Sequence, residues 1–231
     1  MANLLIKELV SKKEVTLHGE KGKVYIMKNY PKIDFYGNLP TVGKNKMPVL
    51  KPFNGHFPNR MTVFDEAYTK KDFDCIVHFY ESDIRFMRLF HNPMKYLGFL
   101  QKCSAVIGPD LSQFAYMDEE SRYFHAWHNR AMSVWLQQNG VNIIPNVTWS
   151  RRDSFTYSYD GMPLGSVIAV NCTGILKYDV SMYLWKEGYK NVVLPLKPSV
   201  IIRYGDKMPD EQDNITIHFC NERINCLRYG G

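Results

Sequence analysis

The amino-acid sequence predicts an α/β protein with about five parallel strands and crossover helices. The arrangement is either an open doubly wound sheet or a partial TIM-like barrel. Two observations carry this prediction. From about residue 71 onward, strand-like and helix-like segments alternate at a spacing of roughly 30 residues. The strand-like segments are also continuous apolar runs, which is typical of parallel strands covered by helices rather than of strands with one wet face.

Each predicted element has a local signal in the chain. Strands are predicted at 74–80, 104–110, 141–149, 166–174 and 199–205, and one more at 214–220. Helices are predicted at 82–102, with a break near Pro93, at 117–140, and over most of 180–196. Ser82 or Asp83 is a plausible N-cap for the first of these helices. The long helix begins with three acidic residues that suit the positive end of its dipole, and Asn139-Gly140 is a good C-terminal stop.

Residues 1–70 read as a basic, aromatic-rich extension packed on an α/β domain of residues 71–231. Its many Pro and Gly residues rule out long helices and leave a short helix at 1–10 and a short strand at 23–27. The charge is uneven, because residues 1–60 hold 11 Lys and Arg against 4 Asp and Glu, whereas residues 61–231 hold 18 against 19. The basic segment indicates either a nucleic-acid or other polyanion surface or an ordinary solvated lysine-rich surface.

Several classes of protein lack support in the sequence. The five Cys residues are odd in number and form no C-x-x-C pair, which argues against a disulfide framework or zinc knuckle. There is no signal-peptide pattern and no run of 18 apolar residues, so the expectation is a soluble cytoplasmic protein without a membrane partner. Neither G-x-G-x-x-G after the first strand nor a P-loop motif occurs, and the cofactor stays unknown. His125 and His128 lie three residues apart on the predicted long helix, and we interpret them as ordinary half-buried histidines rather than as a metal site.

The polar residues at the strand ends define the candidate site, because ligands of parallel α/β folds bind beyond the carboxyl ends of the strands. The candidates are His78, Asp83, Asp110, Asn146, Trp149, Asn171 and Tyr204, together with Arg130 on the long helix. Asp83 and Asp110 would be acid–base or metal-binding carboxylates, and Arg130 would hold an anion if its side chain reaches the rim. The two asparagines would orient a ligand and Trp149 would stack on it. Taken singly, each residue also reads as a cap, a turn or a packing residue.

Seven sequence blocks, including "VHFYESDIRF", "IGPDLS", "IIPNVTW" and "LKPSVIIRYG", resemble in order a phage and Firmicute family catalogued as domain of unknown function 4417. The likeness covers about residues 70–220. The family pattern maps onto Asp83, the 109–112 block, Asn129-Arg130, the 145–149 block and Tyr204-Gly205. Two departures are "ESD" in place of paired aspartates and Leu111 in place of an aromatic residue. The resemblance implies a phage or prophage origin and supplies no activity.

Three functions follow as hypotheses. The first is a polar small-ligand or nucleotide-type site at the carboxyl rim, with hydrolysis as one reading. The second is a nucleic-acid-binding accessory protein in phage DNA metabolism, which uses the basic segment. The third is an interaction protein that blocks a host factor, which would not depend on Asp83 or Asp110. A phage-encoded chain would act in the host cytoplasm.

Overall fold

The computed structural model describes residues 14–18, 24–28, 33–209 and 215–219. The helix expected at 1–10 lies outside them. The described part of the chain starts with the antiparallel pair β1 (Glu14–His18) and β2 (Val24–Lys28), followed by the 3₁₀ turn η2 (Ile33–Tyr36). A second small antiparallel pair, β3 (Thr41–Val42) and β4 (Met47–Pro48), packs against the long helix of the body.

The body of the protein is built on seven parallel strands. They are β5 (Met61–Val63), β6 (Ile76–His78), β7 (Ala105–Ile107), β8 (Ile143–Ile144), β9 (Val167–Asn171), β10 (Val200–Tyr204) and β11 (Thr216–Phe219). All five strands predicted in the body are confirmed, and so is the additional one. The strand β5 is not predicted, because three residues among prolines give no usable pattern.

Helices and turns connect these strands. They are α2 (Phe64–Lys70), α3 (Asp83–His91), α4 (Pro93–Leu100), α5 (Glu119–Gln138), η3 (Arg152–Ser154), α6 (Phe155–Tyr159), η4 (Ile175–Lys177), α7 (Asp179–Gly188), the π-helical turn η5 (Tyr189–Val193) and η6 (Leu194–Leu196). The break near Pro93 is confirmed, since Pro93 opens α4 and the Asn92 side chain accepts from Lys95 N. The α5 helix is capped by Asp118, and Gly140 follows it with a φ of 80°.

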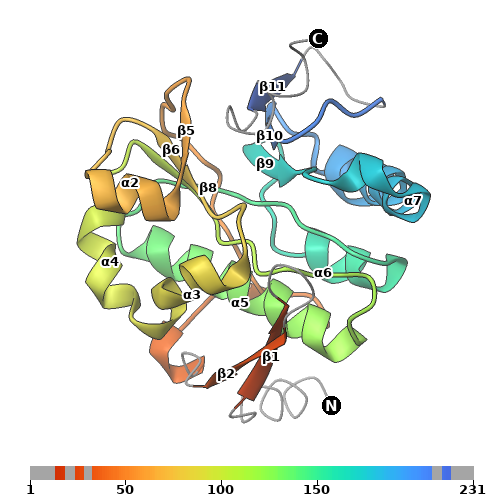
Figure 1. Ribbon diagram of the computed structural model, residues 1–231, viewed down its shortest axis with the longest axis horizontal. Helices are drawn as coiled ribbons and strands as arrows, with labels where there is room; N and C mark the ends of the chain where they lie inside the picture. Colours follow the sequence, from red (N-terminus) through yellow and green to blue (C-terminus); the bar gives the residue numbers. More distant parts are fainter. Residues whose placement is uncertain (1–13, 19–23, 29–32, 210–214, 220–231) are drawn as a thin grey trace.

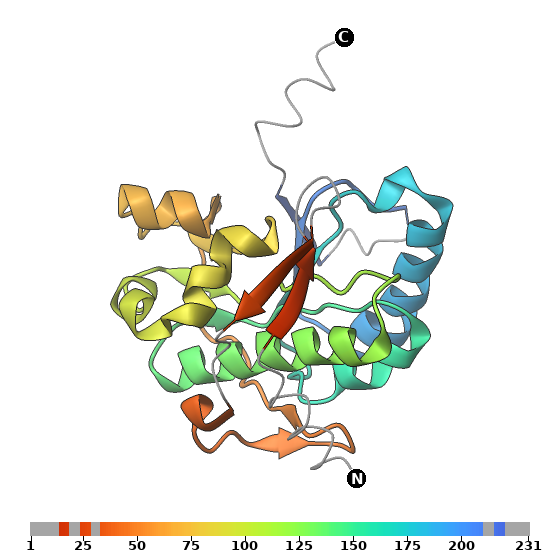
Figure 2. The ribbon, with the colours of Figure 1, turned by 60° about the horizontal axis from the view of Figure 1, so that its bottom comes forward.

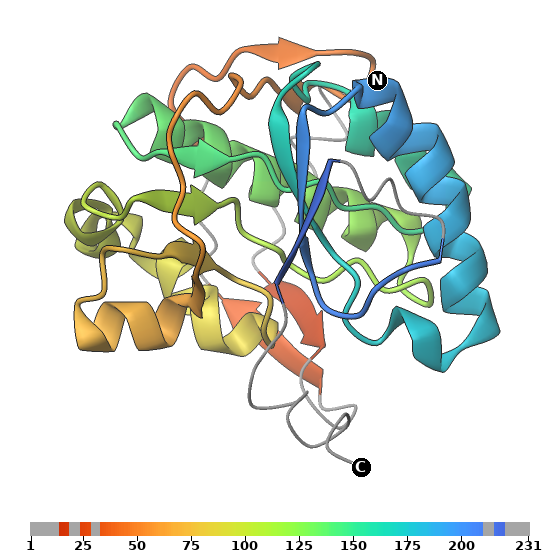
Figure 3. The same cartoon turned by 90° about the horizontal axis from the view of Figure 1, so that it is seen from above.

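The order of the strands decides between the two predicted arrangements. The strands β5-β6-β7-β8 form one parallel sheet and β9-β10-β11 another. A parallel bridge between Asn146 and Ala169 joins them, so that all seven strands lie side by side in chain order. A doubly wound sheet reverses its strand order at a switch point. The sequential order is that of a barrel, and the helices lie around the outside of the strands (Figure 3).

Two apolar layers flank the strands. The outer layer packs the strands against the helices, among them the 20-residue α5 that runs across the molecule (Figure 2). The inner layer is a separate cluster that includes Ile76, Ile107, Ala169 and Ile202. Among the described residues no backbone pairing joins β5 to β11, so the barrel is partial. The concave side is nevertheless filled with side chains, as in closed barrels.

The segment that precedes β5 contributes to both layers. Tyr36, Met47 and Leu50 are buried in the outer layer, while Phe53 is buried in the inner one. The backbone N–H of Phe53 donates to Ser166 Oγ at 3.0 Å, just before β9 begins. Side chains of this segment therefore pack against the helices and strands of the body.

Candidate functional site

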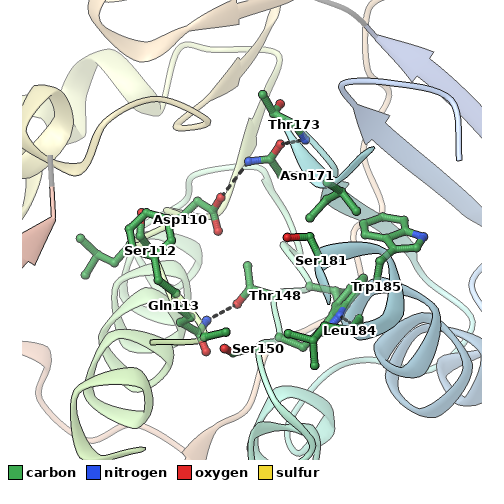
Figure 4. Close-up of a pocket in the computed structure, with 16 residues that line it drawn as sticks. Asp110, Ser112, Gln113, Thr148, Ser150, Asn171, Thr173, Ser181, Leu184 and Trp185 are labelled. Atoms are coloured by element: carbon green, nitrogen blue, oxygen red, sulfur yellow. Dashed lines mark hydrogen bonds between the residues drawn. The ribbon is translucent and has the colours of Figure 1, made fainter. Parts of the chain in front are cut away.

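A cavity of about 260 Å³ opens beyond the carboxyl ends of β7, β8 and β9 (Figure 4). One side is the loop after β7, which contributes Asp110 to Ala115. The floor and the opposite side come from the segments after β8 and β9 and from α7. The lining residues are Asp110, Leu111, Ser112, Gln113, Phe114, Ala115, Val147, Thr148, Trp149, Ser150, Asn171, Thr173, Ile175, Ser181, Leu184 and Trp185. The cavity thus lies where barrel folds place their ligands.

Asp110 is held at this cavity by two asparagines from neighbouring strands. Asn146 Nδ2 donates to Asp110 Oδ1 at 3.2 Å, and Asn171 Nδ2 donates to Asp110 Oδ2 at 3.3 Å. Each amide is oriented by a second bond, because Asn146 Oδ1 accepts from Tyr80 Oη at 2.9 Å and Asn171 Oδ1 accepts from Thr173 N at 3.0 Å. Both amides therefore present N–H groups, not oxygens, to the carboxylate.

This environment tunes the acidity of Asp110. Burial raises its pKa to about 6, and the hydrogen bonds from Asn171 and Asn146 oppose that rise because they stabilise the charged form. A carboxyl group that titrates at about 6 can accept or donate a proton near neutral pH. The geometry therefore supplies one oriented acid–base group at the cavity wall.

Asp83 lies close to Asp110 but does not line the cavity. Its side chain is fully buried at the start of α3, and Oδ1 accepts from Ser112 N at 3.1 Å and from Ser112 Oγ at 2.9 Å. Burial raises the pKa of Asp83 to about 7, with a smaller contribution from the negative charge of Asp110. The contact with Ser112 means that Asp83 acts on the cavity only through the loop that carries Asp110.

His78 and Tyr204 lie in the inner layer, next to the network rather than on the cavity wall. Their ring centroids are 4.6 Å apart, and each ring also contacts Tyr80. His78 Nδ1 accepts from Tyr80 N, and burial lowers the pKa of His78 to about 3, so its imidazole is neutral. The curvature of the barrel brings β6 and β10 face to face. His78 and Tyr204 therefore support Tyr80, which in turn orients Asn146.

Trp149 lines the cavity, and its indole contacts both the barrel side and α7. Its Nε1 donates to the carbonyl of Leu184 at 3.1 Å, and its ring centroid lies 5.0 Å from that of Trp185. A Cβ built at Gly188 would lie 2.0 Å from Trp149 Nε1, so the indole fits only because residue 188 has no side chain. Trp149 thus lines this cavity, and α7 adds Trp185 beside it.

Arg130 does not line the cavity. This position corrects the expectation that its side chain reaches the rim and holds an anion there. Its Nη1 donates to the Asp160 carbonyl at 2.7 Å, and its Nη2 donates to the Ser158 carbonyl at 3.1 Å. A longer contact reaches the carbonyl of Pro48. Arg130 is buried, and these carbonyls occupy the guanidinium that would otherwise hold an anion. Position along α5 decides this, since a residue on a 20-residue helix can face any of several layers.

Asn129 belongs to the Asn129-Arg130 pair of the family pattern, but its contact with the loop that carries Asp110 is not predicted from the sequence. Its Oδ1 accepts from Leu111 N at 2.8 Å and its Nδ2 donates to the Leu111 carbonyl at 3.1 Å. His125, one turn earlier, contacts the Ser112 carbonyl through Nδ1 at 2.5 Å. The loop that carries Asp110 is thus fixed from α5 and from Asp83. Tyr80, Gln113, Thr148 and Ser181 are also absent from the predicted site residues, although Tyr80 and Thr148 lie within the sequence blocks that resemble the family.

The described part of the chain has no group of three or more His, Cys, Asp or Glu side chains placed to hold a metal ion. His128 shares a hydrogen bond with Tyr36 Oη at 3.1 Å, and burial lowers the pKa of His128 to about 3. Cys75, Cys103 and Cys172 are free thiols. No helix within the described ranges is both long and apolar enough to cross a membrane.

The sequence of this chain is similar to two phage proteins. It is 26% identical over 129 residues to the Gene 1 protein of Mycobacterium phage L5, covering 56% of each chain. It is also 26% identical over 129 residues to the Gene 1 protein of Mycobacterium phage D29, covering 56% of this chain and 48% of that protein. The match therefore spans about half the length of these relatives. No solved structure matches the chain.

The family model described as "Domain of unknown function (DUF4417)" matches residues 39–221. The matched range begins ahead of β5 and runs past β11, so it contains all seven parallel strands and every residue that lines the cavity. The resemblance inferred from the seven sequence blocks is confirmed, and the chain belongs to this family.

Proposed function

We propose that the cavity beyond β7, β8 and β9 binds a small polar ligand and that Asp110 is the acid–base group that acts on it. The observation that carries this proposal is the network around Asp110. Two amides fix the carboxylate at the cavity wall, and burial sets its pKa at about 6. Perturbed carboxyl groups that face a cavity are typical of functional sites.

The other predicted residues take supporting roles in this proposal. Asn146 and Asn171 orient Asp110, and Trp149 forms part of the apolar wall on which a ligand would lie. Asp83 fixes the loop through Ser112 and does not touch the ligand. A general base next to a cavity suits proton abstraction from water or a ligand, so hydrolysis is the reaction class that fits a catalytic role.

The test uses the full-length chain and a panel of probes: adenosine, guanosine, cytidine, uridine, ribose, inorganic phosphate and methylamine. Binding is measured by calorimetry for the wild type and for Asp110→Asn. We expect at least one probe to bind with 1:1 stoichiometry and to lose affinity by about tenfold or more in Asp110→Asn, since a lost charge-assisted hydrogen bond has about this effect. Asp74→Asn is the matched control, because Asp74 is exposed at the amino end of β6.

A pH series adds a second readout. A ligand that donates to the carboxylate should bind more tightly as pH rises through about 6, and that rise should be absent in Asp110→Asn. If no probe binds, or if the affinity of the best probe is the same in wild type and Asp110→Asn, the proposal is wrong.

The nucleic-acid alternative rests on the basic segment of residues 1–60. Seven of its 11 Lys and Arg residues lie within residues 1–34, whose side chains are outside the described part of the chain. Of the others, Arg60 is paired with Asp72. Binding of single-stranded DNA that weakens steeply with salt would support this alternative. The named relatives come from mycobacteriophages, and we propose a phage or prophage origin, with action in the host cytoplasm, for this chain as well.

A further inference from the structure

The charge of the cavity limits what it can hold. Among the 16 residues that line it, Asp110 is the only one with a charged side chain. Arg130, which the sequence suggested as an anion-binding cation, donates to backbone carbonyls instead. Arg152, which follows the lining residue Ser150 by two positions, is paired with Glu187 at 2.6 Å. A phosphate group inside the cavity would therefore face a carboxylate without a compensating positive charge among the lining side chains.

The segment that leads from the cavity wall to α5 is acidic as well. Phe114 lines the cavity, and the chain continues from it through Tyr116 to Asp118, Glu119 and Glu120 at the start of α5. The carboxylate of Asp118 caps the helix by accepting from Ser121 N and Ser121 Oγ. Residues 114–120 include no Lys or Arg that could pair with a ligand phosphate.

Asp110 decides which hydrogen-bonding groups a ligand needs at the polar end of the cavity. Asn146 Nδ2 donates to Asp110 and to the Pro109 carbonyl, and Asn171 Nδ2 donates to Asp110. Tyr80 and Thr173 fix the orientations of the two amides. What Asp110 offers to the cavity is therefore acceptor capacity. A ligand must bring N–H or O–H donors to it. A nucleobase edge with a ring N–H beside an exocyclic amine presents two such donors in one plane.

The apolar walls are flat and aromatic. Trp149, Trp185 and Phe114 line the cavity together with Leu184. Phe114 is 39% exposed and stacks on Tyr116, which is 67% exposed, with a centroid distance of 5.2 Å and an interplanar angle of 7°. Aromatic walls stack on bases whatever the sequence, because every base has a π-face. The volume of about 260 Å³ lies just below the usual range of ligand cavities, which starts at about 300 Å³, and so suits one base rather than an oligomer.

We propose that the ligand of this cavity is an uncharged nucleobase or nucleoside, bound with a donor edge on Asp110 and its ring between the aromatic walls, and that nucleotides with a 5′-phosphate are disfavoured. The proposal rests on the proposed function and narrows it from polar ligands in general to one class. It also separates this cavity from any polyanion surface formed by the basic segment of residues 1–60.

The experiment is calorimetry on the full-length chain at pH 7.5 and low salt. The probes are adenosine, guanosine, cytidine and uridine, each compared with its own 5′-monophosphate, with ribose and methylamine alongside. We expect the affinity for one nucleoside to exceed the affinity for its 5′-monophosphate by about tenfold or more. Asp110→Asn should weaken nucleoside binding, because it removes the charge of the acceptor. It should also reduce the difference in affinity between the nucleoside and its 5′-monophosphate, because it removes the repulsion between the carboxylate and the phosphate.

Two more variants keep the test independent of the folding of Asp110→Asn. Ser181→Trp fills the cavity from α7 without touching Asp110 and should abolish nucleoside binding. Phe114→Ala removes an aromatic side chain of the cavity wall and should weaken nucleoside binding. Asp74→Asn should change nothing, since Asp74 lies at the opposite end of β6 from the cavity.

The outcomes separate this inference from the proposed function. A 5′-monophosphate that binds as tightly as its nucleoside, or tighter, overturns the inference. So does an absence of binding for all four nucleosides, or binding of ribose with the affinity of the nucleoside. If ribose or methylamine then binds in a manner that depends on Asp110, the proposed function stands without the inference. Nucleoside binding that is unaffected by Asp110→Asn and by Ser181→Trp counts against both.

Discussion

Asn129 and Leu111 are joined by two hydrogen bonds between one side-chain amide and both backbone groups of one residue, at 2.8 and 3.1 Å. Leu111 directly follows Asp110, so α5 fixes the backbone next to the carboxylate that faces the cavity. Both residues are buried, and no water is needed to satisfy either backbone group.

Asn129→Ala should destabilise the protein. It leaves the N–H and the carbonyl of Leu111 buried without their partner, and each buried unpaired group costs about 1–3 kcal/mol. The free energy of unfolding from urea titration measures the loss. Gln138→Ala, on an exposed face of the same helix, is the control and should stay within about 0.5 kcal/mol of wild type. Equal stability of the two variants would show that the Asn129 bonds do not hold the loop.

Arg130→Met should lower stability without changing the binding of anions. The guanidinium links α5 to the carbonyls of Ser158 and Asp160, and removal of its charge-assisted hydrogen bonds should cost about 2–3 kcal/mol or more. Chemical denaturation gives the stability, and calorimetry with inorganic phosphate gives the binding. A loss of phosphate affinity in a variant of unchanged stability would restore Arg130 to the site and contradict its position here.

Asp83 should make stability fall as pH rises. Burial raises its pKa from 3.8 to about 7, so between these values the folded state binds more protons than the unfolded state. The free energy of unfolding then decreases as pH rises, by up to about 1.4 kcal/mol per pH unit for one such group. The stabilising contribution of protonated Asp83 is fully present below pH 3.8 and is lost above about pH 7.

Asp83→Asn isolates this effect, because the amide oxygen can still accept from Ser112 and the variant cannot ionise. The stability difference between Asp83→Asn and wild type should move in favour of the variant from pH 5 to pH 8. Titrating groups that do not interact with Asp83 cancel in the difference. Parallel stability profiles over that range would mean that Asp83 has an ordinary pKa in the folded protein.

Gly188→Ala should destabilise the protein, although alanine favours helices by about 1 kcal/mol over glycine. The new Cβ would lie 2.0 Å from Trp149 Nε1, so the indole must leave its place against α7 and lose its bond to the Leu184 carbonyl. Near-UV circular dichroism and the melting temperature report the change. Gly98→Ala on α4 is the matched control, since its Cβ would meet nothing within 4 Å and should be neutral or stabilising. A stabilised Gly188→Ala would mean that Trp149 does not pack at this glycine.

The sequence by itself determined the class of fold and the end of the strands at which the cavity opens. Continuous apolar runs separated by helical segments leave few alternatives to a parallel sheet, and the polar residues that follow each run must lie at its carboxyl edge. Asp110, Asn146, Trp149 and Asn171 are brought together for that reason. The strand β5, by contrast, has only three residues, too few for a periodic pattern.

The tertiary structure decided everything that depends on where two elements meet. Strand order is a property of pairing, not of local pattern, so only the bridge between Asn146 and Ala169 selects a barrel over a doubly wound sheet. Arg130 and Asn129 are adjacent in sequence, yet one faces the carbonyls of α6 and the other the Asp110 loop. A helix rotates by about 100° per residue, so neighbouring side chains point to different layers, and only packing fixes which layer each one reaches.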